Sequence, residues 1–302
     1  MNKKLIKITL ISFLTFSFFC NFILITTTDA RTMRAKEDLN EKLYNAIEAN
    51  DLKLVEELIS KGVKVNQCIN NLGNFRNITP LMYALFKGKN EMVELLINKG
   101  ADTNSKDKDG DTPIIYASKY GNKEIMEFLI NKGSNLSDKS NNGQTLLMYS
   151  SEYGNKEIVE FLINKGADVN SKDKDDQTAL MYVSKNGHEE IAKLLMSKGA
   201  NIDYKDKYGK NVFIYSLTYG KKEIAELLIN KGYNVNYKDK NGNNTLIYAL
   251  KNGNKEILEL LIKKGANIDY KSNDGQMILI NASKYGNKEI MELLINKGSD
   301  IN

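Results

Sequence analysis

The feature that most constrains this chain is a phrase that recurs every 33 residues. The stretch GNKEIMEFLINKG begins at Gly121, and GNKEIMELLINKG, which differs at one position, begins at Gly286. The opening glycine of the phrase recurs at this constant interval, as Gly88, Gly121, Gly154, Gly187, Gly220, Gly253 and Gly286. A degenerate earlier copy, NDLKLVEELISKG, begins at Asn50. A period of this length is typical of stacked repeat proteins, and here it predicts eight copies.

The first half of one unit, residues 107–139, predicts a turn followed by a short helix. Gly110 stands in an Asp-Gly step, where glycine adopts positive φ without strain. Thr112 can cap the start of a helix with its hydroxyl, and Pro113 suits the first helical position. The apolar stretch IIYASKY that follows is therefore predicted to be the first helix of the unit.

The second half of the same unit predicts another short helix. Gly121 interrupts the first helix, and Ile125, Phe128 and Leu129 then form an apolar stripe at helical spacing. Helices this short are not stable alone in water. Each pair must bury its apolar stripes against neighbouring pairs, so the repetition itself is a packing solution.

Four first-helix segments carry a family resemblance. TPLMYAL at Thr79, TPIIYAS at Thr112, TLLMYSS at Thr145 and TALMYVS at Thr178 resemble the Thr-Pro-Leu-His-x-Ala signature of ankyrin repeats. GHEEIAKLLMSKGANID, from Gly187, resembles the second half of that repeat. The resemblance implies an all-α solenoid of stacked helix-turn-helix units with projecting turns or hairpin loops. The predicted repeats cover residues 39–66, 79–106, 112–139, 145–172, 178–205, 211–238, 244–271 and 277–302.

The sequence departs from the family pattern in two ways. The family's histidine position is occupied by Met82, Ile115, Met148, Met181, Ile214, Ile247 and Ile280. We therefore expect apolar contact to replace the hydrogen bonds that the histidine usually makes. Asp176 stands where other turns carry glycine, which predicts a locally less stable turn.

The N-terminal 30 residues read as a targeting segment. A basic start, MNKKLIK, precedes a long apolar run, and small residues end it at Ala30. This order predicts a secretory signal peptide over residues 1–30 that is cleaved after Ala30, with a short linker over 31–38. The run is also long enough for an uncleaved membrane anchor, and Cys20 is a candidate lipidation site despite the bulky Phe19 before it. In each case the protein is expected to be exported across a bacterial-type membrane, to a periplasm or out of the cell.

The sequence carries no constellation of catalytic or metal-binding residues. His188 is the only histidine, and with two cysteines it cannot build the usual zinc sites. A nucleophile–histidine pair would have to use His188, and no serine motif accompanies it. The acidic turns at Asp107 and Asp173 lack the glutamate that closes a calcium loop. Only three arginines accompany a net charge of +5, which disfavours nucleic acid. We predict no enzyme activity, cofactor, metal or nucleic-acid partner; Cys68, in the longer loop 67–78, is either a reactive thiol or a passive residue.

Three sets of residues recur at the repeat period and are candidates for binding a protein partner. One is a tyrosine column, Tyr83, Tyr116, Tyr149, Tyr182, Tyr215 and Tyr248. The second is a lysine column in the turns, Lys106, Lys139, Lys172, Lys205, Lys238 and Lys271. The third varies between copies and includes Phe86, Tyr120, Tyr153, Tyr208 and Tyr219.

Each regular column has two interpretations. The resemblance implies that first helices line a concave face where partners bind, so the tyrosines would offer rigid contact area. Alternatively, each ring packs between neighbouring first helices. The lysines would meet an acidic partner or an anionic polymer, or they form a solvated surface that adjacent aspartates largely neutralise.

The sequence favours a protein-binding scaffold without catalytic activity. It would bind a protein partner through the concave face and the turn tips. The alternative is a membrane-tethered surface component that holds an anionic polymer or self-associates through its C-terminal repeat. Membrane contact would involve residues 1–30 alone.

Overall fold

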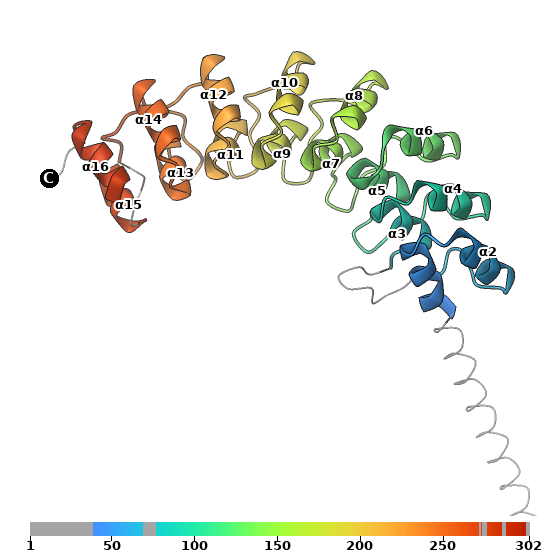
Figure 1. Cartoon of the computed structure of the whole chain (residues 1–302). Helices are drawn as coiled ribbons and strands as arrows, with labels where there is room; N and C mark the ends of the chain where they lie inside the picture. The colour runs from blue at the N-terminus through green and yellow to red at the C-terminus, as the bar shows by residue number, and fades with distance from the viewer. Residues whose placement is uncertain (1–38, 69–76, 272, 274–276, 286–287, 300–302) are drawn as a thin grey trace, which may run out of the picture. The chain divides into compact units, whose positions relative to one another are not determined.

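The computed structural model describes residues 39–68, 77–271, 273, 277–285 and 288–299 (Figure 1). The predicted signal peptide, its cleavage after Ala30, the linker and most of the loop 67–78 lie outside these ranges. Within them every regular element is a helix, which confirms the all-α repeat fold. No helix in the described ranges is both long and apolar enough to cross a membrane. The number of repeats in the whole chain and its export stay predictions.

The chain divides into two compact units, Met1–Asp102 and Thr103–Asn302. In the first unit the helices span residues 39–48, then α2 (Leu52–Ser60), α3 (Pro80–Phe86) and α4 (Asn90–Asn98). Their core includes the fully buried side chains of Leu43, Ile47, Leu81 and Leu96. Burial of one such side chain contributes roughly 1.5–3 kcal/mol, which is how helices this short become stable together.

The second unit contains the remaining helix pairs. They are α5 (Pro113–Tyr120), α6 (Lys123–Asn131), α7 (Leu146–Tyr153), α8 (Lys156–Asn164), α9 (Ala179–Asn186), α10 (Glu189–Ser197), α11 (Val212–Thr218), α12 (Lys222–Asn230), α13 (Thr245–Asn252), α14 (Lys255–Lys263), α15 (Ile278–Lys284) and α16 (Lys288–Asn296). Odd-numbered helices pack on their odd-numbered neighbours, and α6 to α14 do the same in a second row (Figure 1). First helices are buried over most of their length, whereas second helices bury one face only. In α6 the buried residues are Ile125, Met126 and Leu129, while Phe128 is half-buried.

The first helices begin at capping residues, but not always at the predicted ones. Thr145 Oγ1 accepts the N–H of Met148 at 3.2 Å, as a helix cap does. Pro113 occupies the first turn of α5, as predicted. Thr112 does not cap α5, contrary to our expectation, because its hydroxyl donates to Asp138 Oδ2 at 2.8 Å. That bond ties the start of α5 to the following return loop.

The methionines at the family's histidine position make more than apolar contact. The backbone N–H of Thr79 lies 3.5 Å from Met82 Sδ, and that of Thr145 lies 3.4 Å from Met148 Sδ. A thioether sulfur is a weak acceptor. The expectation of purely apolar replacement is therefore wrong at these two positions, where sulfur accepts from the capping residue.

Hairpin turns connect successive repeats. They span residues 106–111, 139–144, 172–177, 205–210 and 238–243. Neighbouring turns are joined by backbone bonds, such as Asn141 N–H to Asp109 O at 2.8 Å. Gly110, at φ +77°, approaches so closely that a Cβ there would lie 2.4 Å from Asn141 Oδ1. Asp176 adopts φ 61°, so it takes the left-handed conformation that glycine adopts elsewhere, at a cost to its turn.

Candidate protein-binding surface

The tyrosine column in the second unit fastens hairpin turns to first helices. In four turns the tyrosine hydroxyl donates to a turn aspartate nine residues earlier. The pairs are Tyr116 with Asp107 (2.8 Å), Tyr182 with Asp173 (2.7 Å), Tyr215 with Asp206 (2.9 Å) and Tyr248 with Asp239 (2.5 Å). Burial raises the pKa of each of these tyrosines far above its ordinary value, and the adjacent carboxylate raises it further.

The second carboxylate oxygen of each aspartate holds the turn itself. Asp173 Oδ1 accepts the backbone N–H groups of Asp175 and Gln177, both at 2.8 Å. Asp107, Asp206 and Asp239 repeat this pattern. One carboxylate therefore satisfies two turn amides and one helix hydroxyl, and its charge is directed inward.

The hairpin at 139–144 solves the same problem with a different residue. Ser140 stands at the aspartate position, and Tyr149 instead donates to Asp111 Oδ1 at 3.2 Å. Asp111 is buried and pairs with Lys119 at 2.5 Å, and the Lys119 ammonium lies 4.1 Å from the centre of the Tyr149 ring. Burial raises the pKa of Asp111, which Lys119 partly opposes. This ion pair was not predicted from the sequence.

The first unit uses a surface glutamate for the same purpose. Tyr83 donates to Glu48 Oε2 at 3.1 Å, and Lys87 contacts Glu48 Oε1 at 2.6 Å. The hydrogen bond from Lys87 lowers the pKa of the Glu48 carboxyl.

Burial removes most of the tyrosine column from the exposed surface. Only 4–7% of each side chain is exposed at Tyr83, Tyr116, Tyr149, Tyr182 and Tyr248. Tyr215 is half-buried, and its hydroxyl also lies 3.0 Å from Gln177 Oε1. The expectation that the column offers contact area to a partner is not met by the five buried rings, to which we assign a structural role.

The varied positions, in contrast, are accessible. Tyr153, Tyr208 and Tyr219 are 44%, 54% and 43% exposed, and Tyr120 and Phe86 are half-buried. Apart from Tyr208, which stands at a hairpin tip, these residues lie at the C-terminal ends of first helices.

Contacts between these aromatic side chains fix their orientation. The rings of Tyr120 and Tyr153 meet edge to face at 5.1 Å, and their hydroxyls are 3.2 Å apart. Tyr219 stacks on Tyr215 at 6.4 Å, and the Lys185 ammonium lies 5.7 Å from the Tyr219 ring. The exposed tyrosines are thus held in place before any partner binds.

The lysine column is exposed throughout, at Lys106, Lys139, Lys172, Lys205, Lys238 and Lys271. Three of its ammonium groups lie over tyrosine rings that directly precede the next lysine of the column: Lys172 over Tyr204, Lys205 over Tyr237 and Lys238 over Tyr270. The sequence analysis did not identify these three tyrosines. Their spacing of 33 residues, each directly before a column lysine, is the signal that could have found them.

The only histidine and the described cysteine have ordinary environments. His188 Nε2 lies 3.0 Å from the carbonyl oxygen of Glu152, and its ring packs against Gly154. Cys68 is a half-buried free thiol whose pKa is raised by burial. The described residues contain no group of three or more His, Cys, Asp or Glu side chains that could hold a metal ion.

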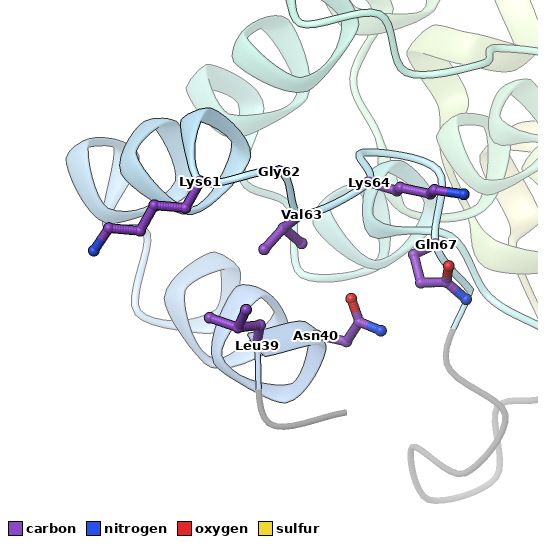
Figure 2. Close-up of a pocket in the computed structure, with 7 residues that line it drawn as sticks. All are labelled: Leu39, Asn40, Lys61, Gly62, Val63, Lys64 and Gln67. Carbon is purple, nitrogen blue, oxygen red and sulfur yellow. The ribbon is translucent and has the colours of Figure 1, made fainter. Parts of the chain in front are cut away.

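A recess of about 240 Å³ in the first unit lies between the helix at 39–48 and the loop after α2. Leu39 and Val63 line it, and the Lys61 and Lys64 ammonium groups point away from each other (Figure 2). Its polar side chains do not converge on one point, so we do not assign a ligand site to this recess.

Comparison with known proteins assigns the repeats. The family model described as ankyrin repeats (3 copies) matches residues 20–107, 43–140, 81–173, 168–239 and 214–302. The chain is 38% identical over 69 residues to E3 ubiquitin-protein ligase KEG of Arabidopsis thaliana, covering 23% of this chain and 4% of the relative. It is 39% identical over 74 residues to ankyrin repeat, SAM and basic leucine zipper domain-containing protein 1 of Atelerix albiventris, covering 24% and 14%.

A third relative is an enzyme by name. The chain is 33% identical over 86 residues to 2-5A-dependent ribonuclease of Mus musculus, covering 28% of this chain and 11% of the relative. The matched stretches thus span a small part of each relative. The overlapping family matches cover most of this chain, and ankyrin repeats generally mediate protein–protein interaction. The chain belongs to the ankyrin repeat family.

Proposed function

We propose that this protein is a binding scaffold without catalytic activity, and that it holds a partner protein through the exposed ends of its first helices. The supporting observation is the set of accessible tyrosines there, Tyr153 and Tyr219 with the half-buried Tyr120. Tyrosine is enriched among the residues that dominate binding energy, because it offers a large rigid surface with a polar tip. The contacts already described reduce the entropy that these rings lose on binding.

The hairpin tip at Tyr208 extends the proposed surface. Its ring is 54% exposed, and the Lys207 ammonium lies 5.0 Å from it. Lys207 is itself held by Asp175 at 2.6 Å. A partner that reaches from the helix ends to this turn would contact both kinds of exposed tyrosine.

An affinity capture with matched variants tests this proposal. The bait is residues 31–302, and the test variant replaces Tyr120, Tyr153 and Tyr219 with serine. The matched control, Asn131→Ser, Asn164→Ser and Asn230→Ser, changes three exposed neutral residues at the ends of second helices. Because hot-spot residues each contribute about 2 kcal/mol or more, the tyrosine variant should lose a captured protein that the control retains. Equal capture by both variants would refute the assignment of this surface.

Export is part of the proposal and is supported by the basic and apolar N-terminal sequence. N-terminal sequencing of the protein from its native host distinguishes the alternatives. Arg31 at the N-terminus indicates a cleaved signal peptide and a free binder. Retention of residues 1–30 indicates the membrane-tethered alternative.

Self-association is supported by two exposed apolar residues on α15 and α16. Ile280 on α15 is 53% exposed, and Ile295 on α16 is 46% exposed. Sedimentation velocity should show a concentration-dependent dimer that Ile280→Lys abolishes. A monomer at all concentrations would exclude this mode.

A further inference from the structure

The lysine column forms a continuous row with tyrosines of the second unit. The ammonium of Lys172 lies 4.7 Å from the Tyr204 ring centre, that of Lys205 5.0 Å from Tyr237, and that of Lys238 4.3 Å from Tyr270. Each of these tyrosines directly precedes a lysine of the column. We call this set, Lys172, Tyr204, Lys205, Tyr237, Lys238 and Tyr270, the lysine–tyrosine row.

Two of the three rings of the row are fixed by hydrogen bonds. Tyr237 donates to the carbonyl oxygen of Gly209 at 2.6 Å, and Tyr270 donates to that of Gly242 at 2.5 Å. Both acceptors belong to the preceding hairpin. A cation over such a ring gains roughly 0.5–1 kcal/mol at an exposed site. This gain favours the lysine rotamers that place the ammonium groups over the rings.

The aspartates next to these lysines do not neutralise the outward face. Asp206 and Asp239 are 3% and 7% exposed, and their oxygens are occupied by turn amides and tyrosine hydroxyls. The alternation of an extended chain places the lysines outside and the aspartates inside. The expectation that adjacent aspartates cancel the charge of the row is therefore wrong at these two hairpins.

The remaining acidic groups affect one end of the row more than the other. Lys172 lies 3.8 Å from the exposed Asp176 carboxylate, which partly neutralises it. Among the described residues, Lys205 and Lys238 form no ion pair. Beside Lys205 a recess of about 590 Å³ is lined by Lys231, Tyr233 and Tyr237 and also by the exposed Asp203, whose carboxylate offsets one of the two lysine charges there. Positive charge is thus concentrated around Lys205 and Lys238.

The repeat spacing determines which acidic ligand fits. Packed helices lie about 8–10 Å apart, and first helices of neighbouring units pack directly on one another, so successive column lysines are separated by a similar distance. A polyproline II segment has three residues per turn and rises about 3.1 Å per residue. Side chains at every third residue of such a segment therefore share one face at intervals of about 9 Å.

We propose that the lysine–tyrosine row binds an extended acidic segment of a partner protein, with a carboxylate at every third residue. Each carboxylate would pair with one column lysine, and the tyrosine rings would contact the residues between them. This site is separate from the tyrosines at the helix ends and goes beyond the function proposed above.

Two synthetic peptides test the spacing. One carries four glutamates at every third position of an otherwise proline- and alanine-rich sequence, and the other has the same composition with the glutamates adjacent. Titration by fluorescence anisotropy uses the protein over residues 31–302 at physiological ionic strength. The spaced peptide should bind at least about 5-fold more tightly than the clustered one, since only the spaced carboxylates reach successive lysines.

Matched lysine variants test the location. Lys172→Gln, Lys205→Gln and Lys238→Gln combined should weaken binding of the spaced peptide at least about 10-fold. The control, Lys123→Gln, Lys156→Gln and Lys255→Gln, removes the same charge from the second helices and should change affinity less than about 2-fold. Far-UV circular dichroism confirms that both variants are folded.

Three outcomes would overturn the proposal. Equal affinity for the two peptides would show attraction by net charge alone, as would equal weakening by the two triple variants. Binding of inorganic polyphosphate or of phosphatidylserine vesicles through the row lysines, with no binding of either peptide, would identify a different ligand class. The variant lacking Tyr120, Tyr153 and Tyr219 should bind the spaced peptide normally, so failure here is distinguishable from failure of the helix-end surface.

Discussion

The hairpins at residues 139–144 and 172–177 differ in the residue that accepts hydrogen bonds from the turn amides. In the second, Asp173 accepts two turn amides and the hydroxyl of Tyr182. In the first, Ser140 Oγ accepts only the N–H of Gln144, at 3.3 Å, and Tyr149 donates elsewhere. Serine is shorter and uncharged, so it cannot replace the carboxylate.

The comparison shows that both tyrosine hydroxyls donate to a carboxylate, which comes from the tyrosine's own hairpin in one case and from the preceding hairpin in the other. Asp111, from the preceding turn, accepts the hydroxyl of Tyr149, and the half-buried Lys119 compensates its charge. The equivalent positions in the next two turns are Gln144 and Gln177, which carry no charge. The tyrosine column therefore stabilises the stacked repeats. The side chains that we propose to bind a partner protein lie outside this column.

The largest effect is expected from breaking the substitute arrangement. Lys119→Ala leaves the Asp111 carboxylate buried without its cation, which should cost about 3–5 kcal/mol of unfolding free energy. Adding Asp111→Asn to this variant should recover part of the loss, because no buried charge remains. Urea denaturation followed by circular dichroism measures both. Equal losses in the single and double variants would show that the ion pair is not the cause.

Replacing Asp173 in one hairpin and Ser140 in the other should reduce the free energy of unfolding by different amounts. Asp173→Ala deprives two amides and one hydroxyl of their acceptor, and the expected loss is about 2–3 kcal/mol. Ser140→Ala removes one long hydrogen bond and should cost less than about 1 kcal/mol. The same denaturation experiment compares them, and a larger loss in the serine variant would contradict the account.

The contribution of the tyrosine hydroxyls to the free energy of unfolding should decrease at alkaline pH. Burial raises the pKa of Tyr182, so the folded state disfavours the phenolate. Its contribution is fully present below the unfolded tyrosine pKa of about 10 and is lost as the pH rises above that value. Tyr182→Phe should cost about 1 kcal/mol at pH 7 and should make stability fall less steeply between pH 9 and pH 11. An unchanged pH dependence would show that this hydroxyl is not coupled to folding.

The smallest effect is expected at an exposed ring of the same residue type. Tyr208 is 54% exposed at a hairpin tip, so Tyr208→Ser should change the unfolding free energy by no more than about 0.5 kcal/mol. Thermal unfolding beside the Tyr182→Phe variant measures the contrast. If Tyr208→Ser were as destabilising as Tyr182→Phe, the division between structural and exposed tyrosines would fail.

The repeat period predicted the helical fold because the same spacing that positions apolar residues on one unit positions them on the next. Pro113 at the start of α5 and the buried Ile125 and Leu129 of α6 followed from local rules. Thr112 did not follow them, since a carboxylate from the next loop competes for its hydroxyl. Local propensity cannot include a partner that only the stacking of units brings close.

The binding surface was less predictable for the same reason. The spacing of nine residues between a turn aspartate and its tyrosine was present in the sequence, and so was its interruption at Ser140. Two features depend on how adjacent repeats pack. They are the inward direction of those aspartates and the contact of column lysines with tyrosine rings of the next repeat. Composition alone therefore suggested a neutralised surface where the structure separates the charges.

A double-mutant cycle tests the central claim most directly. Asp173→Ala and Tyr182→Phe, measured singly and together by urea denaturation, should show a coupling free energy of about 1–2 kcal/mol. The cycle of Ser140→Ala with Tyr149→Phe should give a smaller value, below about 1 kcal/mol, since that hydroxyl donates to Asp111 and interacts only weakly with the Ser140 side chain. Equal coupling in the two cycles, or none in the first, would contradict a tyrosine column that fastens each unit through a carboxylate.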